Sequence, residues 1–111
     1  MFLSTVKKSS FVLLLVLSIA SFGQEKHLKN IKQLTFGGDN AEAYFSPKGD
    51  KLTLQVTNKA FGVSCDQIFM LDLQAQEFNE KSLQLVSTGK GRTTCSYYMP
   101  DGKHILYAST H

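Results

Sequence analysis

The chain has 111 residues, of which 42% are hydrophobic and 19% charged, and its formal net charge is +3. This length accommodates one small domain at most, and the apolar content is too high for an intrinsically disordered chain. Two of the positive charges, Lys7 and Lys8, lie in a segment that we expect to be removed. The remaining charge of about +1 argues against nucleic acid or an anionic membrane as the partner.

Residues 1–23 have the pattern of a secretory signal peptide. Two lysines precede the apolar run FVLLLVL at residues 11–17, and small residues follow up to Gly23. The run is much shorter than the roughly 20 residues that span a bilayer, and its flanks are typical of an exported protein. We therefore expect a mature chain that begins at Gln24, lacks a membrane span and is periplasmic or secreted. An uncleaved membrane anchor is the alternative.

The remainder of the chain has the pattern of a β-rich domain. Residues 24–30 form a short polar lead-in, after which short apolar runs alternate with turn residues about every ten positions. Leu52, Leu54 and Val56 alternate with polar residues, which predicts a strand with one buried face. No window has a helical stripe of adequate length. The predicted strands are residues 31–36, 41–46, 52–57, 67–73, 82–87, 94–99 and 104–109.

Two stretches of the chain are copies of one unit. Residues 44–54 align with residues 97–107 at a constant offset of 53, with proline matching proline and glycine matching glycine. In each copy proline presets the first central position of a turn, and glycine accepts the positive φ that closes it. Self-similarity over several tens of residues is typical of propellers and solenoids, and the alternation excludes a helical solenoid. The turn residues of the two expected hairpins are Pro47, Gly49, Pro100 and Gly102.

Aromatic residues also recur at matching positions of the two copies. Tyr44 and Phe45 precede the first turn, and Tyr97 and Tyr98 precede the second. Because the same pair recurs at the same offset, we expect it to pack between repeat units rather than to line a ligand site.

These residues resemble the repeat of the TolB-like β-propellers, a WD-repeat-like family of bacterial periplasmic proteins. The resemblance lies in QLT at 33–35, in AEAYFSPKG at 41–49 and in the strands after each turn. Where the family usually has Ser-Pro-Asp-Gly, Lys48 replaces the aspartate of the first copy and Met99 replaces the serine of the second. The resemblance extends over nearly all of residues 31–111.

The resemblance implies a partial β-propeller of about one and a half blades of antiparallel four-stranded sheet. The blades would lie around residues 31–87 and 94–111, with residues 31–36 as the outer strand that closes the ring. Asp39 and Glu42 would then face the central channel. A chain with this content would be the N-terminal part of a longer protein or a truncated gene product.

For function, the resemblance implies an exported, non-enzymatic binding or interaction scaffold of the kind found in cell-envelope and biopolymer-transport systems. Its partner would be another protein of the cell envelope or the further blades of a longer chain. The alternative is the non-catalytic N-terminal propeller of a secreted serine peptidase of the prolyl-oligopeptidase type. A third hypothesis is a fragment without an independent fold.

The only cysteines, Cys65 and Cys95, could form a disulfide in an oxidising compartment. The bond would close a loop of about 30 residues and stabilise the fold by roughly 3 kcal/mol, with free thiols or other partners as the alternatives.

Two cysteines without a matched histidine pair make a weak zinc site, and His27, His104 and His111 are scattered. The chain also lacks a Gly-x-Ser-x-Gly segment. We predict no catalytic, metal or cofactor site.

Overall fold

The computed structural model describes residues 27–111, so the signal peptide predicted at 1–23 lies outside the described residues. The chain divides into two units, Met1–Ile31 and Lys32–His111, and all the strands belong to the second. This second unit is all-β, as predicted, with two single-turn 3-10 helices in its loops. Among residues 27–111 no helix has the length and apolar content that crossing a membrane requires.

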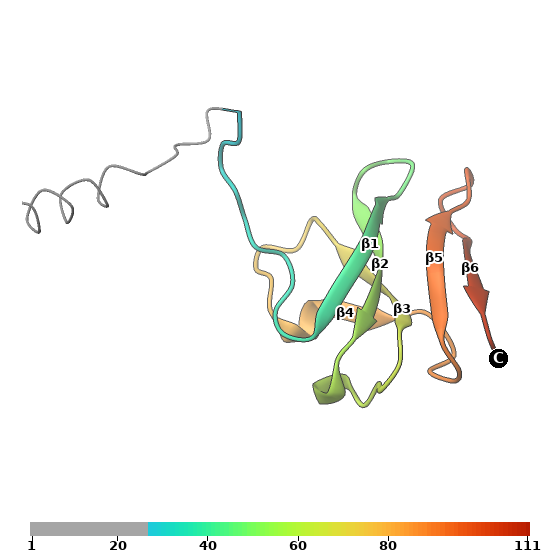
Figure 1. Ribbon diagram of the computed structural model, residues 1–111. Coiled ribbons are helices and arrows are strands. Elements are labelled where there is room, and N and C mark those ends of the chain that lie inside the picture. Colours follow the sequence, from blue (N-terminus) through green and yellow to red (C-terminus); the bar gives the residue numbers. More distant parts are fainter. Residues whose placement is uncertain (1–26) are drawn as a thin grey trace, which may run out of the picture. The chain divides into compact units, whose positions relative to one another are not determined.

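In the part of the chain that the structure describes, six strands form two antiparallel sheets (Figure 1). The first sheet has four strands in the order β1-β2-β3-β4, so each strand pairs with its neighbour in sequence. The second sheet is a hairpin of two strands. The strands are β1 Asp39–Phe45, β2 Lys51–Thr57, β3 Gln67–Asp72, β4 Leu83–Leu85, β5 Thr93–Tyr98 and β6 Ile105–Ser109, and the 3-10 helices are η1 Lys59–Phe61 and η2 Glu80–Ser82.

The main hydrophobic core lies on one face of the first sheet, which we call the core face. Leu52 on β2 is opposite Leu71 on β3, and Leu54 is opposite Phe69, so alternate residues of both strands bring large apolar side chains to this face. Side chains from the flanking segments cover them, namely Leu34, Phe61, Val63, Leu73, Phe78 and Leu83.

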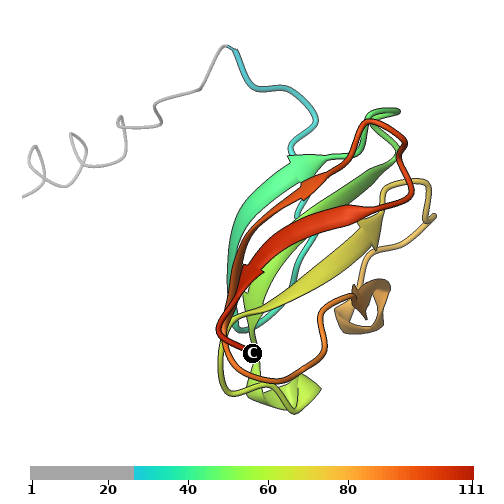
Figure 2. The ribbon, with the colours of Figure 1, turned by 90° about the vertical axis from the view of Figure 1, so that its right-hand side faces the viewer.

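The other face of the first sheet is buried as well, which corrects the prediction that residues 52–57 have one buried face. Thr53 and Ile68 point to this face and are both 0% exposed. The β5–β6 hairpin lies against it, as the two perpendicular views show (Figures 1 and 2). The alternation of apolar and polar residues in β2 predicts that Thr53 faces solvent. This alternation carries no information about a second sheet that packs on the polar face.

The predicted strand at residues 31–36 is wrong, because this segment has no strand conformation. It has no pairing strand among the described residues, so its backbone hydrogen-bonding groups are left outside a β ladder. Leu34 instead packs against the core face, and the Lys32 ammonium lies 4.5 Å from the centre of the Phe78 ring. The segment therefore serves as a cover for the core.

The two hairpins, β1–β2 and β5–β6, have the same turn geometry. In the first, the Gly49 amide donates to the Ser46 carbonyl at 2.8 Å, and in the second the Gly102 amide donates to the Met99 carbonyl at 2.9 Å. Gly49 has φ 71° and Gly102 has φ 66°, the left-handed conformation that favours glycine. The sequence repeat at offset 53 is thus also a repeat of backbone conformation.

A buried glutamine holds the loop before β5 against β3. The side-chain oxygen of Gln67 accepts hydrogen bonds from Ser87 Oγ at 2.7 Å and from the Gly89 amide at 3.1 Å, and its Nε2 donates to the Gly91 carbonyl at 2.8 Å. Gln67 is 1% exposed, and these bonds give its buried amide the partners it needs. This anchor helps to place the second hairpin on the first sheet.

Candidate functional site

Each hairpin has a β-bulge at the same position of the repeat. The register of β1 against β2 shifts between Ala41 and Tyr44, and that of β5 against β6 shifts between Thr94 and Tyr97. Within these bulges Glu42 has φ 49° and Cys95 has φ 52°. Positive φ is uncommon outside glycine and is concentrated at sites where a side chain must be re-aimed. We therefore take the two bulges and their surroundings as the candidate site.

The side chain of the first bulge reaches the backbone of the second. The Glu42 carboxylate accepts a hydrogen bond from the Cys95 amide at 3.1 Å. Since Glu42 and Cys95 are the same position of the repeat, this bond links equivalent points of consecutive hairpins. A carboxylate that accepts from a backbone amide makes a stronger bond than a neutral pair does.

Two tyrosines at the next equivalent position also meet. The rings of Tyr44 and Tyr97 lie 4.4 Å apart between centroids, at an interplanar angle of 42°. A hydrogen bond between the two side chains, together with the charge of an ionised Tyr97, raises the pKa of Tyr44 to about 12. The Tyr44 phenol is therefore neutral at physiological pH, and the contact of the two rings agrees with the expected packing between repeat units.

Beneath the bulges, a buried polar contact joins the two sheets. The hydroxyl groups of Thr53 and Ser96 are 2.8 Å apart, and these residues are 0% and 1% exposed. Nearby, the amide and the hydroxyl of Thr93 both donate to the Asp66 carbonyl, at 2.9 and 3.2 Å. These bonds satisfy polar groups that would otherwise be buried without partners, so they specify how the hairpin sits on the sheet.

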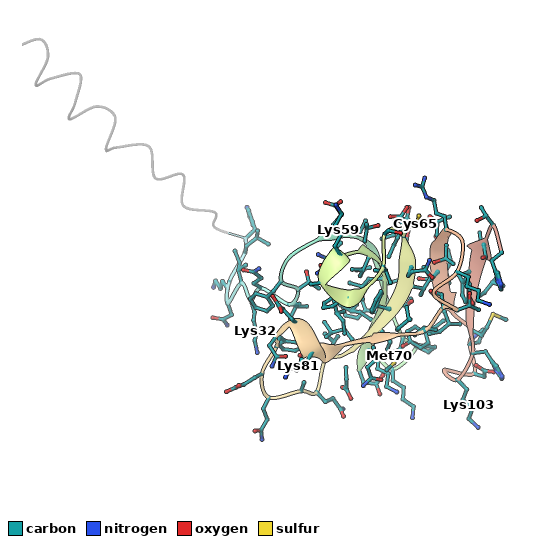
Figure 3. All side chains as sticks on the ribbon, turned by 90° about the horizontal axis from the view of Figure 1, so that it is seen from below. Lys32, Lys59, Cys65, Met70, Lys81 and Lys103 are labelled. Atoms are coloured by element: carbon teal, nitrogen blue, oxygen red, sulfur yellow. The ribbon has the colours of Figure 1, made fainter. Side chains whose placement is uncertain are left out.

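The residues that the sequence singled out lie on several elements, and among them Glu42 and Cys95 are in direct contact. Asp39 and Glu42 lie on β1, the edge strand of the first sheet, and both are exposed. The channel that they were expected to face stays a prediction. Cys65 precedes β3, where Figure 3 labels it, and is half-buried, whereas Cys95 is exposed on β5. Both thiols are free in the structure, and their pairing stays a prediction.

The turn ends of the hairpins are held by carboxylates at different positions of the repeat. Asp50 accepts from Ser46 Oγ at 2.7 Å, and this hydrogen bond lowers the pKa of Asp50. In the second turn, Asp101 Oδ2 lies 2.5 Å from His104 Nδ1, and Asp101 also accepts from the Lys103 and His104 amides. The bond with the His104 ring is the main reason that the pKa of Asp101 falls to about 2.

The features that link the repeats were not predicted from the sequence. Nothing about glutamate or cysteine as residue types predicts positive φ at Glu42 and Cys95. The constant offset does make the two positions equivalent, so a bulge in one hairpin implied a bulge in the other. The Asp101–His104 pair could have been found from the i, i+3 spacing directly after a turn, which brings the two side chains to one side of the chain.

The candidate site exposes several kinds of side chain that can contact another molecule. No cluster of three or more histidine, cysteine, aspartate or glutamate side chains that could hold a metal ion occurs in the part of the chain that the structure describes. The bulges instead offer a carboxylate, a thiol and two phenols beside exposed apolar residues. Comparison with known proteins finds no matching family model, no matching curated protein and no matching solved structure.

Proposed function

We propose that this chain is an exported, non-enzymatic repeat scaffold of the TolB-like β-propeller kind, which binds another protein of the cell envelope. The observation that carries the proposal is the stack of two hairpins with the same turn, the same bulge and the same offset of 53 residues. Units that repeat in this way and pack face to face, when continued, form the radial sheets of a propeller.

The bulge edge of β1 is the part of this scaffold that we expect to bind a partner. It presents the exposed residues Asp39 and Glu42 at the edge of the sheet, where unpaired backbone groups and side chains are both accessible. The resemblance implies that this edge would face the central channel of a propeller. A protein partner is favoured because the edge combines polar and apolar groups without a cluster of charge.

In vivo photo-crosslinking tests the proposal. A photoreactive phenylalanine analogue at Asp39 is expected to form an adduct with another envelope protein in exported chains. The matched control is the same analogue at Lys81, an exposed residue of η2 that lies on the far side of the sheet from the β5–β6 hairpin (Figure 3). Equal adducts at both positions, or none at Asp39, would contradict a partner at this edge.

A further inference from the structure

An apolar pocket lies on the core face of the first sheet, beside β1. Its volume is about 330 Å³, and the side chains that line it include Asn40, Ala43, Leu52 and Leu54. Asn40 donates through Nδ2 to the Gly37 carbonyl at 3.0 Å, but its Oδ1 is buried and has no hydrogen-bond partner within residues 27–111. An apolar pocket beside an unsatisfied oxygen is a surface that a binding partner would improve.

The repeat identifies what kind of surface this pocket is. At the offset of 53 residues, the four lining residues named above correspond to residues of the second hairpin on the side that lies against the first sheet. Two of these counterparts, Thr93 and Ser96, are almost completely buried by that contact, at 0% and 1% exposed. The pocket is therefore the part of this surface on the first hairpin that Leu34 and the other covering side chains leave open, whereas in the second hairpin the equivalent surface packs against a neighbouring unit. The counterparts, in order, are Thr93, Ser96, Ile105 and Tyr107.

The complementary surface is on the outer side of the β5–β6 hairpin. Thr53, on the side of the first sheet that receives this hairpin, corresponds at the same offset to Leu106 on β6. Thr53 is 0% exposed, whereas Leu106 is 63% exposed and its neighbour Tyr97 is 47% exposed. Leu106 thus lies on the second hairpin's copy of a receiving surface, and most of its side chain is exposed.

We propose that these two surfaces bind each other between two copies of this chain, with the Leu106 side of one copy on the Ala43 pocket of the next. The inference rests on the repeat stacking in the proposed function and names a partner for it. Within one chain, Thr53 contacts Ser96 through a hydrogen bond of 2.8 Å. The equivalent contact between chains would join Leu106 to Ala43, so a polar pair is replaced by an apolar pair and both sides remain matched.

The association is head-to-tail and weaker than the contact within the chain. Different surfaces of the two copies meet, so growth closes into a ring or continues as a filament rather than stopping at a symmetric dimer. Within the chain, Glu42 adds a charge-assisted bond to the Cys95 amide. Cys95 occupies that position in the second hairpin and has no carboxylate to offer to the next copy. We therefore expect reversible association that depends on protein concentration.

Sedimentation velocity of the purified protein over roughly a hundredfold range of concentration tests this inference. The sedimentation coefficient is expected to rise with concentration in the wild type. Leu106→Glu and Ala43→Glu each charge one of the two surfaces at an exposed position, and each is expected to weaken association about tenfold or more. Leu85→Glu, at an exposed leucine of β4 outside both surfaces, is the matched control and should associate as the wild type does.

Mixing the two variants gives the sharpest result. Leu106→Glu retains an intact pocket and Ala43→Glu retains an intact Leu106 surface, so an equimolar mixture is expected to form a dimer that grows no further. Association by Ala43→Glu alone would point to a symmetric contact and overturn the head-to-tail inference. A wild type that unfolds cooperatively but stays monomeric throughout would also overturn it, while the envelope-partner proposal would still depend on the crosslinking at Asp39.

Discussion

The buried hydroxyl pair Thr53 and Ser96 offers the most direct test of how the second hairpin sits on the first sheet. Ser96→Ala removes one hydroxyl and leaves the other buried without a partner, and Thr53→Val does the reverse with nearly the same side-chain shape. Leaving one buried polar group unsatisfied costs about 1–3 kcal/mol of the free energy of unfolding. Each single variant should therefore be destabilised by about that amount.

The double variant should cost less than the sum of the two single variants. With both hydroxyls replaced by apolar groups, no polar atom is left buried without a partner, so we expect a coupling free energy of about 1 kcal/mol. In a domain of this size, each kcal/mol corresponds to a shift of about 4–8 °C in the midpoint of thermal unfolding. The destabilisation of the single variants is thus large enough to measure.

Urea denaturation followed by circular dichroism measures all four proteins of this cycle. Ser109→Ala, at an exposed position of β6, is the control and should change the free energy of unfolding by less than about 0.5 kcal/mol. Strictly additive effects of Thr53→Val and Ser96→Ala would refute the reasoning, because residues in contact must show coupling. The two sheets would then not meet at these side chains.

Three further outcomes follow from the geometry. Gly38→Ala should lower the free energy of unfolding by about 3 kcal/mol in chemical denaturation, since at φ 67° its Cβ would lie 2.5 Å from a backbone oxygen. Gly49→Ala has open space around the new Cβ, so it should lower the free energy of unfolding by only about 1 kcal/mol. Equal losses would contradict this. Carboxyl NMR should show Asp101 titrating at about 2, and His104→Ala should raise this pKa toward the ordinary value. Because the folded-state pKa is lowered, the stability from Asp101 is present above about pH 4 and is lost as the pH falls toward 2. An unchanged titration in the variant would exclude the ring as the cause. Glu42→Ala should speed hydrogen exchange of the Cys95 amide, because the carboxylate that accepts from it is removed. Glu42→Gln keeps an acceptor and should speed the exchange less. Identical exchange rates in the two variants would argue against the hydrogen bond between Glu42 and the Cys95 amide.

The amino-acid sequence alone determined the β class, most strand positions and the two equivalent hairpins. Alternation of apolar residues in β2 and the Pro-x-Gly turns are local signals, because each depends on residues that are neighbours in the chain. The same locality explains the error at residues 31–36. A short apolar run predicts burial, but whether it pairs as a strand depends on a partner that lies elsewhere in the chain.

Only the tertiary structure decided which surfaces of these strands meet. The burial of Thr53, the bond between Glu42 and the Cys95 amide and the clamp around Gln67 all join residues at least 20 positions apart. No periodicity within one strand encodes such contacts, because they depend on how one sheet is stacked on another. The offset of 53 residues identifies equivalent positions from the sequence, and the stacking then buries Thr53 and leaves its equivalent, Leu106, exposed.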